Sequence, residues 1–242
     1  MENVAEDLIS RWRYAGKHQL KIYPEDDDIF SSSSNIGTGD HKFHLDFIPK
    51  PILGNINEAK IFILMANPGY CIEDEYYEND PEFQQYLWNN LCQENLESVK
   101  YPVYFFDPKW EGHPGYKYWN KRFRFLIDPD NLIKEYAEEE IRKCASHHIA
   151  IIQYIPYHSR KFGCPIILTS TQDVVKFVND TLKYKVENDD AIIIVVRKAK
   201  EWGLEEDPQK ILIMNRWYAF IGLFNPEAKK VIRDKIEKIL QR

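Results

Sequence analysis

Four short and mostly apolar runs constrain the fold of this chain more than any other feature of its sequence. They cover residues 61–65, 149–155, 191–196 and 211–214, and isoleucine is their commonest residue. Each run is long enough for a buried strand and too short for a helix of ordinary length. Mostly helical patterns separate them, which is typical of a parallel sheet covered on both faces. The sequence therefore predicts an α/β fold, a three-layer α/β/α domain with a central four-stranded parallel sheet.

The size and composition of the chain fit one folded domain. Its 242 residues, 44% of them hydrophobic and 29% charged, are enough for a single domain with a sizeable core. Residues 1–46 are expected to form an N-terminal extension made of a helix and a loop. No apolar run reaches the ~18–20 residues of a membrane span, and no signal-peptide pattern opens the chain. We therefore expect one domain over residues 1–242, cytoplasmic and without a membrane partner.

The cysteines, the histidines and the common catalytic motifs argue against several classes of protein. The four cysteines show no Cys-x-x-Cys spacing, so neither a zinc ribbon nor a disulfide framework is expected. His41 and His44 could share a metal ion, but no neighbouring residue completes a ligand set. Gly-x-Ser-x-Gly, His-Glu-x-x-His and the P-loop motif are all absent. We therefore predict no metal and no cofactor. The net charge of −6 argues mildly against a protein that simply coats nucleic acid.

Polar side chains follow all four apolar runs, at the positions where the predicted strands end. Right-handed crossovers place the carboxyl ends of parallel strands at one edge of a sheet, so these side chains should surround one pocket. The first run ends at Asn67-Pro68-Gly69, where Asn67 presents an amide to the pocket or serves only as a turn residue. The other run ends supply Tyr157, His158, Ser159, Arg160, Arg197, Asn215 and Arg216. The predicted pocket therefore holds amides, an imidazole and guanidinium groups, but no pair of carboxylates.

Residues 101–127 interleave aromatic rings with lysines and arginines. Such rings suit the stacking of bases, and such cations suit contacts with phosphates. Most of these rings are equally well explained as core residues, and Tyr116, Tyr118 and Trp119 are the ones expected to be exposed. The segment is therefore compatible with a nucleic-acid partner and does not require one.

The order of the strands and the first strand end resemble the uracil-DNA glycosylase superfamily, whose domain is a four-stranded parallel sheet between helices. The resemblance covers residues 47–242. In the mismatch-specific thymine/uracil branch the first motif ends in Asn-Pro-Gly, and Asn67-Pro68-Gly69 looks like that motif. Asn215 stands where the last motif begins with His or Asn, although Arg216 and Trp217 follow it in place of the usual Pro-Ser. Residues 155–160 are similar to a feature of an uncharacterised bacterial subgroup of this superfamily.

The resemblance implies hydrolysis of the N-glycosidic bond of a damaged or mismatched base by a water molecule. Asn67 would position that water, and His158 or Asn215 would donate a hydrogen bond to the departing base. The base-reading asparagine after the second strand has no clean match, and Gln153 or His158 is nominated for its role. The residues implied in substrate binding are Pro68, Gly69, Tyr70, Gln153, Tyr154 and Tyr157. The residues implied in phosphate binding are Ser159, Arg160, Arg197 and Arg216.

Two other functions are compatible with the same pocket. The first is a non-catalytic module that binds a nucleotide or nucleic acid. The second is a hydrolase of free nucleotides, in which the cations face a single phosphate. The expected partner is a nucleic acid or a nucleotide in each case.

Overall fold

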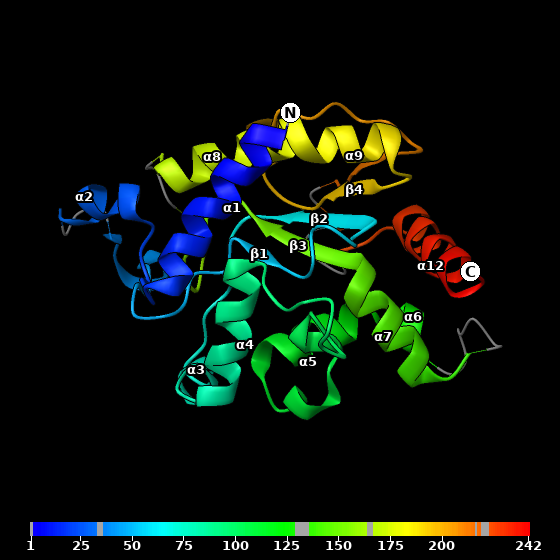
Figure 1. Ribbon diagram of the computed structural model, residues 1–242, viewed down its shortest axis with the longest axis horizontal. Helices are drawn as coiled ribbons and strands as arrows, with labels where there is room; N and C mark the ends of the chain where they lie inside the picture. The colour runs from blue at the N-terminus through cyan, green and yellow to red at the C-terminus, as the bar shows by residue number, and fades with distance from the viewer. Residues whose placement is uncertain (1, 33–35, 129–135, 164–166, 216, 219–222) are drawn as a thin grey trace.

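The computed structural model describes residues 2–32, 36–128, 136–163, 167–215, 217–218 and 223–242 (Figure 1). Its centre is a sheet of five strands in the order β1-β3-β2-β4-β5. The strands are β1 (Ile52–Leu53), β2 (Ile61–Met65), β3 (Ile149–Gln153), β4 (Ile192–Val195) and β5 (Ile211–Ile213). Strands β3, β2, β4 and β5 are parallel to one another, so the predicted α/β class is confirmed.

The prediction of a purely parallel four-stranded sheet is wrong, because β1 adds a fifth strand that is antiparallel to β3. This segment contains prolines and is only two residues long, so the sequence suggested no more than an extended approach to β2. The carbonyl oxygen of Pro51 accepts a hydrogen bond from the amide of Gln153 at 2.9 Å. Proline is tolerated at a sheet edge, where its missing N–H faces no partner strand. Gly54 ends the strand with φ +103°, and a Cβ there would lie 2.6 Å from the carbonyl oxygen of Ile149.

Helices cover both faces of the sheet. Figure 1 shows α8 and α9 on one side of it and α4, α5 and α7 on the other. Every residue of β2, β3 and β4 is buried, as expected for strands enclosed on both faces. The longer helices are α1 (Glu2–Lys17), α4 (Pro81–Cys92), α5 (Pro114–Arg122), α7 (Glu138–His148), α8 (Thr169–Phe177), α9 (Lys183–Asn188) and α12 (Pro226–Leu240). Shorter helical segments are α2 (Asp27–Phe30), α3 (Asp74–Glu78), α6 (Arg124–Ile127) and α10 (Ala199–Trp202).

Side-chain caps fix where two of the long helices begin. Asp80 precedes α4, and its carboxylate accepts hydrogen bonds from the backbone amides of Glu82 at 2.9 Å and Phe83 at 3.0 Å. Asn225 precedes α12 and accepts from the amide of Ala228 at 2.7 Å. A proline follows each cap at the first helical position, where its missing N–H costs nothing. These residues start the helices that lie against the sheet.

The connections of β2 and β3 leave the sheet on opposite sides. The chain passes from β2 to β3 through α4, α5 and α7, and from β3 to β4 through α8 and α9 (Figure 1). Such a reversal opens a crevice between the carboxyl ends of two neighbouring parallel strands, and ligands of open α/β sheets bind there. The topology therefore indicates that a ligand would bind at the loops that start at Ala66 and Tyr154.

The segment before residue 47 packs onto the loop after β3. Asp26 is fully buried and accepts hydrogen bonds from the hydroxyl of Tyr157 at 2.7 Å and the amide of Ser170 at 3.1 Å. The backbone amide of His44 donates to the carbonyl of His158 at 2.9 Å. The predicted N-terminal helix is present as α1, which packs against both α4 and α8. This segment therefore supports the loop that carries His158.

The expected exposure of three rings in α5 is wrong for two of them. Tyr118 is 37% exposed, whereas Tyr116 and Trp119 are buried. Residues three apart on a helix share one face, and Trp119 stacks on Phe105 with ring centroids 5.0 Å apart. The cations between these rings therefore mark the outer face of α5. Among the described residues, no helix has the length and apolar content needed to cross a membrane.

Candidate functional site

A cleft of about 790 Å³ opens at the carboxyl ends of β2 and β3, and we call it the strand-end cleft. Its lining includes eight of the residues nominated from the sequence: Asn67, Pro68, Gly69, Tyr70, Gln153, His158, Arg160 and Arg197. A cleft of this size accommodates a small organic ligand such as a nucleotide. The edge of the sheet therefore gathers most of the predicted side chains into one cavity.

Asn67 has its amide nitrogen fixed by three acceptors. Its Nδ2 donates to the carbonyl of Pro68 at 2.9 Å, to the hydroxyl of Ser159 at 2.8 Å and to the carbonyl of Tyr157 at 3.4 Å. Carbonyl oxygens only accept hydrogen bonds, so the nitrogen and not the oxygen of the amide must face them. No donor among the described residues reaches Asn67 Oδ1. This oxygen is therefore available to a water molecule or a ligand.

His158 is 2% exposed, and its ring is held by the carbonyl of Gly69, 2.8 Å from Nδ1. Because that carbonyl can only accept, Nδ1 carries the hydrogen and Nε2 is left with a lone pair. Burial, with a contribution from nearby Lys50, lowers the pKa of His158 well below its ordinary value. Nε2 has no hydrogen-bond partner among the described residues. In this state Nε2 accepts a hydrogen bond and cannot donate the one that the resemblance implies.

Gln153 ends β3 beneath the cleft and is 4% exposed. Its Oε1 is buried and has no partner in the described part of the chain. A buried amide oxygen without a partner costs free energy, about 1–3 kcal/mol in proteins. A ligand with an N–H group would recover that cost. Gln153 therefore suits the base-reading role for which it was nominated.

Two tyrosines nominated for substrate binding, Tyr70 and Tyr154, differ in their surroundings. Tyr70 lines the cleft and is already stacked on His44, with centroids 3.5 Å apart, and its hydroxyl donates to Glu75 at 2.6 Å. Tyr154 does not line the cleft and packs edge-on against Trp202, with centroids 5.2 Å apart. Tyr70 is therefore the one of the two that a ligand in the cleft could reach.

Three other nominated residues have structural roles outside the cleft lining, and one cannot be placed. Tyr157 is buried and bonds to Asp26, and Ser159 positions the amide of Asn67. Asn215 is exposed and caps a turn, because its Oδ1 accepts from the amide of Tyr218 at 3.1 Å. Arg216 lies outside the described residues.

The cleft also contains buried ionisable residues that were not nominated from the sequence. Lys50 Nζ lies 2.5 Å from Glu78 Oε1, and both side chains are almost fully buried. Asp74 lines the cleft and accepts a hydrogen bond from the amide of Cys71 at 2.8 Å. Burial and the Asp74 carboxylate raise the pKa of the Cys71 thiol to about 12, so this cysteine is not a thiolate nucleophile. Asp74 and Glu78 belong to an acidic stretch whose sequence carries no signal that it folds inward.

His113 is the least exposed ionisable residue of the cleft lining, at 1%. It caps helix α5, because its Nδ1 accepts from the amide of Gly115 at 2.8 Å. Burial and then Lys50 lower its pKa to about 2. Its Nε2 is 3.8 Å from Asp74 Oδ1, too long for a hydrogen bond, and has no other partner among the described residues. A lone histidine before Pro-Gly gave no sequence signal for this position.

Four cations stand at the rim of the cleft, two after β3 and two after β4: Arg160, Lys161, Arg197 and Lys198. Asp40 lies 2.7 Å from Lys161 Nζ and 3.7 Å from Arg160 Nη1. Lys198 pairs with Glu201 and lies over the ring of Phe162, 4.8 Å from its centroid. Such a rim suits phosphate groups on a ligand whose other end enters the cleft.

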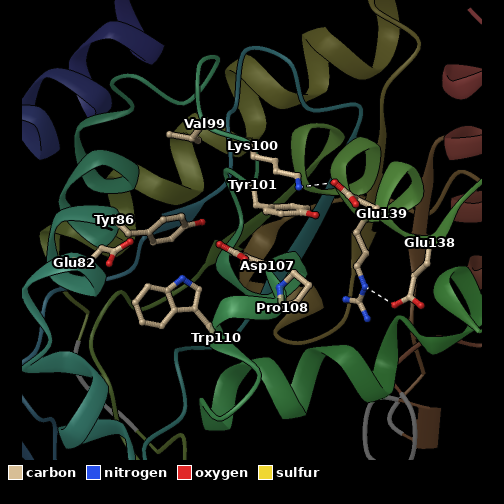
Figure 2. A pocket seen from close by; sticks show the side chains of 11 residues that line it. Glu82, Tyr86, Val99, Lys100, Tyr101, Asp107, Pro108, Trp110, Glu138 and Glu139 are labelled. Atoms are coloured by element: carbon tan, nitrogen blue, oxygen red, sulfur yellow. Dashed lines mark hydrogen bonds and ion pairs between the residues drawn. The ribbon is translucent and has the colours of Figure 1, made fainter.

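A second hollow, of about 620 Å³, lies between α4 and α7 (Figure 2). Its walls carry Tyr86, Tyr101 and Trp110 together with several carboxylates. Most of its charged groups are already paired. Lys100 bonds to Glu139, and Glu138 accepts from Nε of Arg142 at 2.7 Å. The strand-end cleft is the better candidate site, because three residues of its lining each have a buried polar atom without a partner among the described residues, against one such residue, Arg142, in the second hollow.

The described residues contain no group of three His, Cys, Asp or Glu side chains that could hold a metal ion. Comparisons with protein-family models, with curated proteins and with solved structures find no match to this chain. A functional assignment therefore rests on the chemistry of the strand-end cleft.

Proposed function

We propose that the strand-end cleft binds a nucleobase and that the protein hydrolyses the N-glycosidic bond of a damaged or mismatched base in nucleic acid. The observation that carries this proposal is the orientation of Asn67. Its Nδ2 is held by three oxygen acceptors, which leaves Oδ1 available in the same cleft as two buried atoms without partners among the described residues, Gln153 Oε1 and His158 Nε2. An oriented water and a base-binding floor are the two things this reaction needs.

The chemistry requires little reactivity from the protein itself. The sugar develops oxocarbenium character while the base leaves with negative charge, so an oriented water and fixed hydrogen-bonding groups suffice. Asn67 Oδ1 would accept a hydrogen bond from the water and hold it near the sugar. The amide of Gln153 would bind the base. This assignment fits a cleft whose one cysteine has a raised pKa and whose two buried histidines, His113 and His158, have lowered pKa values.

A polymeric substrate would bring its phosphates to the rim of the cleft. Arg160 and Arg197 follow different strands and would contact the backbone on two sides of the extruded base. A base in a duplex must leave the stack to enter such a cleft, which costs a few kcal/mol and least for a mismatched base. Tyr118 is a partly exposed ring at the cleft, and the Arg122 guanidinium lies over one of its faces, 3.3 Å from the centroid, so a neighbouring base could stack on the other face.

We further infer that the fold is a three-layer, uracil-DNA glycosylase-like domain. The support is the block of four parallel strands with Asn67-Pro68-Gly69 at the end of β2, where the superfamily's first motif is expected. Strand β1 would be an addition at the edge of that block. Asn215 is given no catalytic role, because its side chain caps a turn.

The test is strand cleavage after base release. Oligonucleotides that contain uracil, hypoxanthine or a mismatch, single- and double-stranded, are incubated with the protein and then treated with alkali. We expect breaks at one of these bases with the wild type and at least a ~100-fold lower rate with Asn67→Ala, because the water loses its orientation. Asn188→Ala is the matched control, since this amide donates to Tyr184 on α9. Equal rates for wild type and Asn67→Ala would reject the assigned role.

A non-catalytic binding module is the second candidate function. It is favoured by the net charge of −6 and by the carboxylates that already pair with the rim cations. Binding without strand breaks on any substrate would support the module. A polymer binder should lose affinity steeply with added salt, whereas a binder or hydrolase of free nucleotides should lose far less.

A further inference from the structure

We propose that His113 and His158 form a donor–acceptor pair of fixed tautomers, which selects a base that presents a carbonyl oxygen and a ring N–H. This inference rests on the proposed function in taking a nucleobase as the ligand of the strand-end cleft. It does not depend on cleavage. Bases with such a lactam edge include uracil, thymine, hypoxanthine and guanine.

The backbone fixes the tautomer of each ring. The carbonyl of Gly69 can only accept, so Nδ1 of His158 holds the hydrogen and Nε2 is an acceptor. The amide of Gly115 can only donate, so Nδ1 of His113 is an acceptor and Nε2 holds the hydrogen. The two imidazoles therefore present opposite groups, an Nε2–H donor on His113 and an Nε2 acceptor on His158.

Both groups are without partners at the same cavity. The two residues line the strand-end cleft, they are 1% and 2% exposed, and neither Nε2 atom has a hydrogen-bond partner among the described residues. Buried polar atoms without partners are rare in folded proteins, so an unpartnered donor and an unpartnered acceptor in the walls of one cleft indicate a polar ligand.

The residues packed around His113 and His158 bury both rings and restrict their rotation. His113 packs against the rings of Tyr77, Phe83 and Tyr104, with centroids 4.8–4.9 Å apart. His158 packs edge-on against Phe47 at 5.2 Å. The charged groups of the cleft floor are the Lys50–Glu78 pair and the Asp74 carboxylate, 3.8 Å from His113 Nε2. That carboxylate favours a hydrogen on the Nε2 that faces it.

Histidines with fixed tautomers distinguish a lactam base from cytosine or adenine, whereas a side-chain amide does not. A glutamine such as Gln153 offers a donor and an acceptor and can turn to suit either kind of base edge. A lactam gives an oxygen to His113 and an N–H to His158. Held in the same orientation, cytosine and adenine would place an amino donor at the His113 donor and a bare ring nitrogen at the His158 acceptor. A site with buried polar groups rejects such a ligand strongly.

The tautomers are measured first, by NMR of the imidazole nitrogens in the ¹⁵N-labelled wild-type chain. We expect His158 as the Nδ1–H form and His113 as the Nε2–H form, both neutral at pH 7. Either ring in the other tautomer, or protonated, would overturn the proposal. This measurement needs no variant, so it stays decisive if a substituted chain fails to fold.

Selectivity is measured by following the same signals during titration with uridine, 3-methyluridine and cytidine. Uridine should shift both histidines and bind about ten-fold more tightly than the other two nucleosides, which lack the N–H. Equal affinities, or no shift with any nucleoside at millimolar concentration, would overturn the proposal. His158→Gln and His113→Asn should each reduce the uridine preference to below about three-fold, and asparagine still caps α5. An unchanged preference in both variants would also overturn it.

The outcome separates this inference from the proposed function. A uridine preference without strand cleavage would reject the glycosylase and keep the histidine pair. Strand cleavage that depends on Asn67 but shows no preference for lactam bases would keep the glycosylase and reject the pair.

Discussion

The two buried histidines of the strand-end cleft, His113 and His158, make folding sensitive to acid. Both rings are buried, and burial lowers the pKa of His113 to about 2 and that of His158 well below its ordinary value. In the unfolded chain a histidine takes up a proton below about pH 6.5. The unfolded state then binds more protons than the native state, so the free energy of unfolding falls as the pH falls.

We therefore expect His113→Asn to flatten the pH dependence of stability. Each buried neutral histidine should cost the wild type about 1.4 kcal/mol per pH unit below pH ~6. Urea unfolding at several pH values between ~7.5 and ~4.5 measures the free energy of unfolding of both chains. As the pH falls, the free energy of unfolding of the variant should rise relative to that of the wild type by about 1.4 kcal/mol per pH unit. His18→Asn is the control, because this ring is exposed. Parallel pH profiles for wild type and His113→Asn would contradict the assigned neutral state.

The sequence predicted individual site residues only where they follow a strand. Asn67 and His158 follow apolar runs, so the rule about strand ends was enough to find them, whereas Gln153 was nominated only through the family resemblance. His113 caps α5 and Asp74 begins α3, and only tertiary packing brings them to the same cleft. A buried lysine such as Lys50 has no local signature, because its partner Glu78 is 28 residues away.

At the scale of elements, the parallel strands were predictable because they are buried on both faces and apolar at nearly every position. Strand β1 was not, since two residues between a proline and a glycine carry no periodic pattern. Tyr116 and Trp119 of α5 were predicted to be exposed and are buried, because an aromatic residue on a short helix can face either the core or a cleft. Aromatic content alone does not distinguish the two.

Helix α12 is tied to the turn before β4 by Asp190. Its carboxylate accepts from Lys235 at 2.8 Å and Lys238 at 3.0 Å, and these bonds, that of Lys235 above all, lower its pKa to about 2. A carboxylate with a lowered folded pKa adds stability that is present above its unfolded pKa of about 4 and lost as the pH falls toward 2. Because the side chain is 56% exposed, solvent screening keeps this contribution below about 1 kcal/mol.

We expect Asp190→Asn to lower the melting temperature at pH 7 by a few degrees at most, and to have a smaller effect as the pH falls below about 4. Calorimetry at pH 7, 5 and 3 measures the difference from the wild type. Asp189→Asn is the matched control, since its carboxylate lies 3.8 Å from Lys185 and does not contact α12. An Asp190→Asn effect that stays constant from pH 7 to pH 3 would argue against these two bonds.

At the scale of the whole molecule, the sequence predicted which segments form the parallel strands better than it predicted the order of the strands in the sheet. Nothing in the apolar runs shows that β2 is central, between β3 and β4. That order sends the connections of β2 and β3 to opposite sides and so opens the cleft between them. The sequence also carried no sign of how closely the predicted N-terminal extension packs onto the rest of the domain. The contacts of Asp26 join residues more than 130 positions apart.

These contacts make Asp26 a structural support of the cleft. Its buried carboxylate accepts from the hydroxyl of Tyr157 at 2.7 Å and from both the amide and the hydroxyl of Ser170. Tyr157 is the neighbour of His158 in the chain, and its own hydroxyl accepts from the amide of Tyr23 at 3.1 Å. The N-terminal segment and the loop after β3 therefore share one buried network, and loss of its centre should loosen both.

We expect Asp26→Ala to lower the free energy of unfolding by about 2–4 kcal/mol, because it leaves two buried hydroxyls without their acceptor. Urea unfolding measures this loss, and Asp28→Ala, an exposed acid on α2, is the control. The imidazole signal of His158 should also shift in the variant, since the loop that carries it loses its anchor at Tyr157. A loss of less than about 0.5 kcal/mol, equal to that of Asp28→Ala, would mean that the segment before residue 47 does not support the cleft.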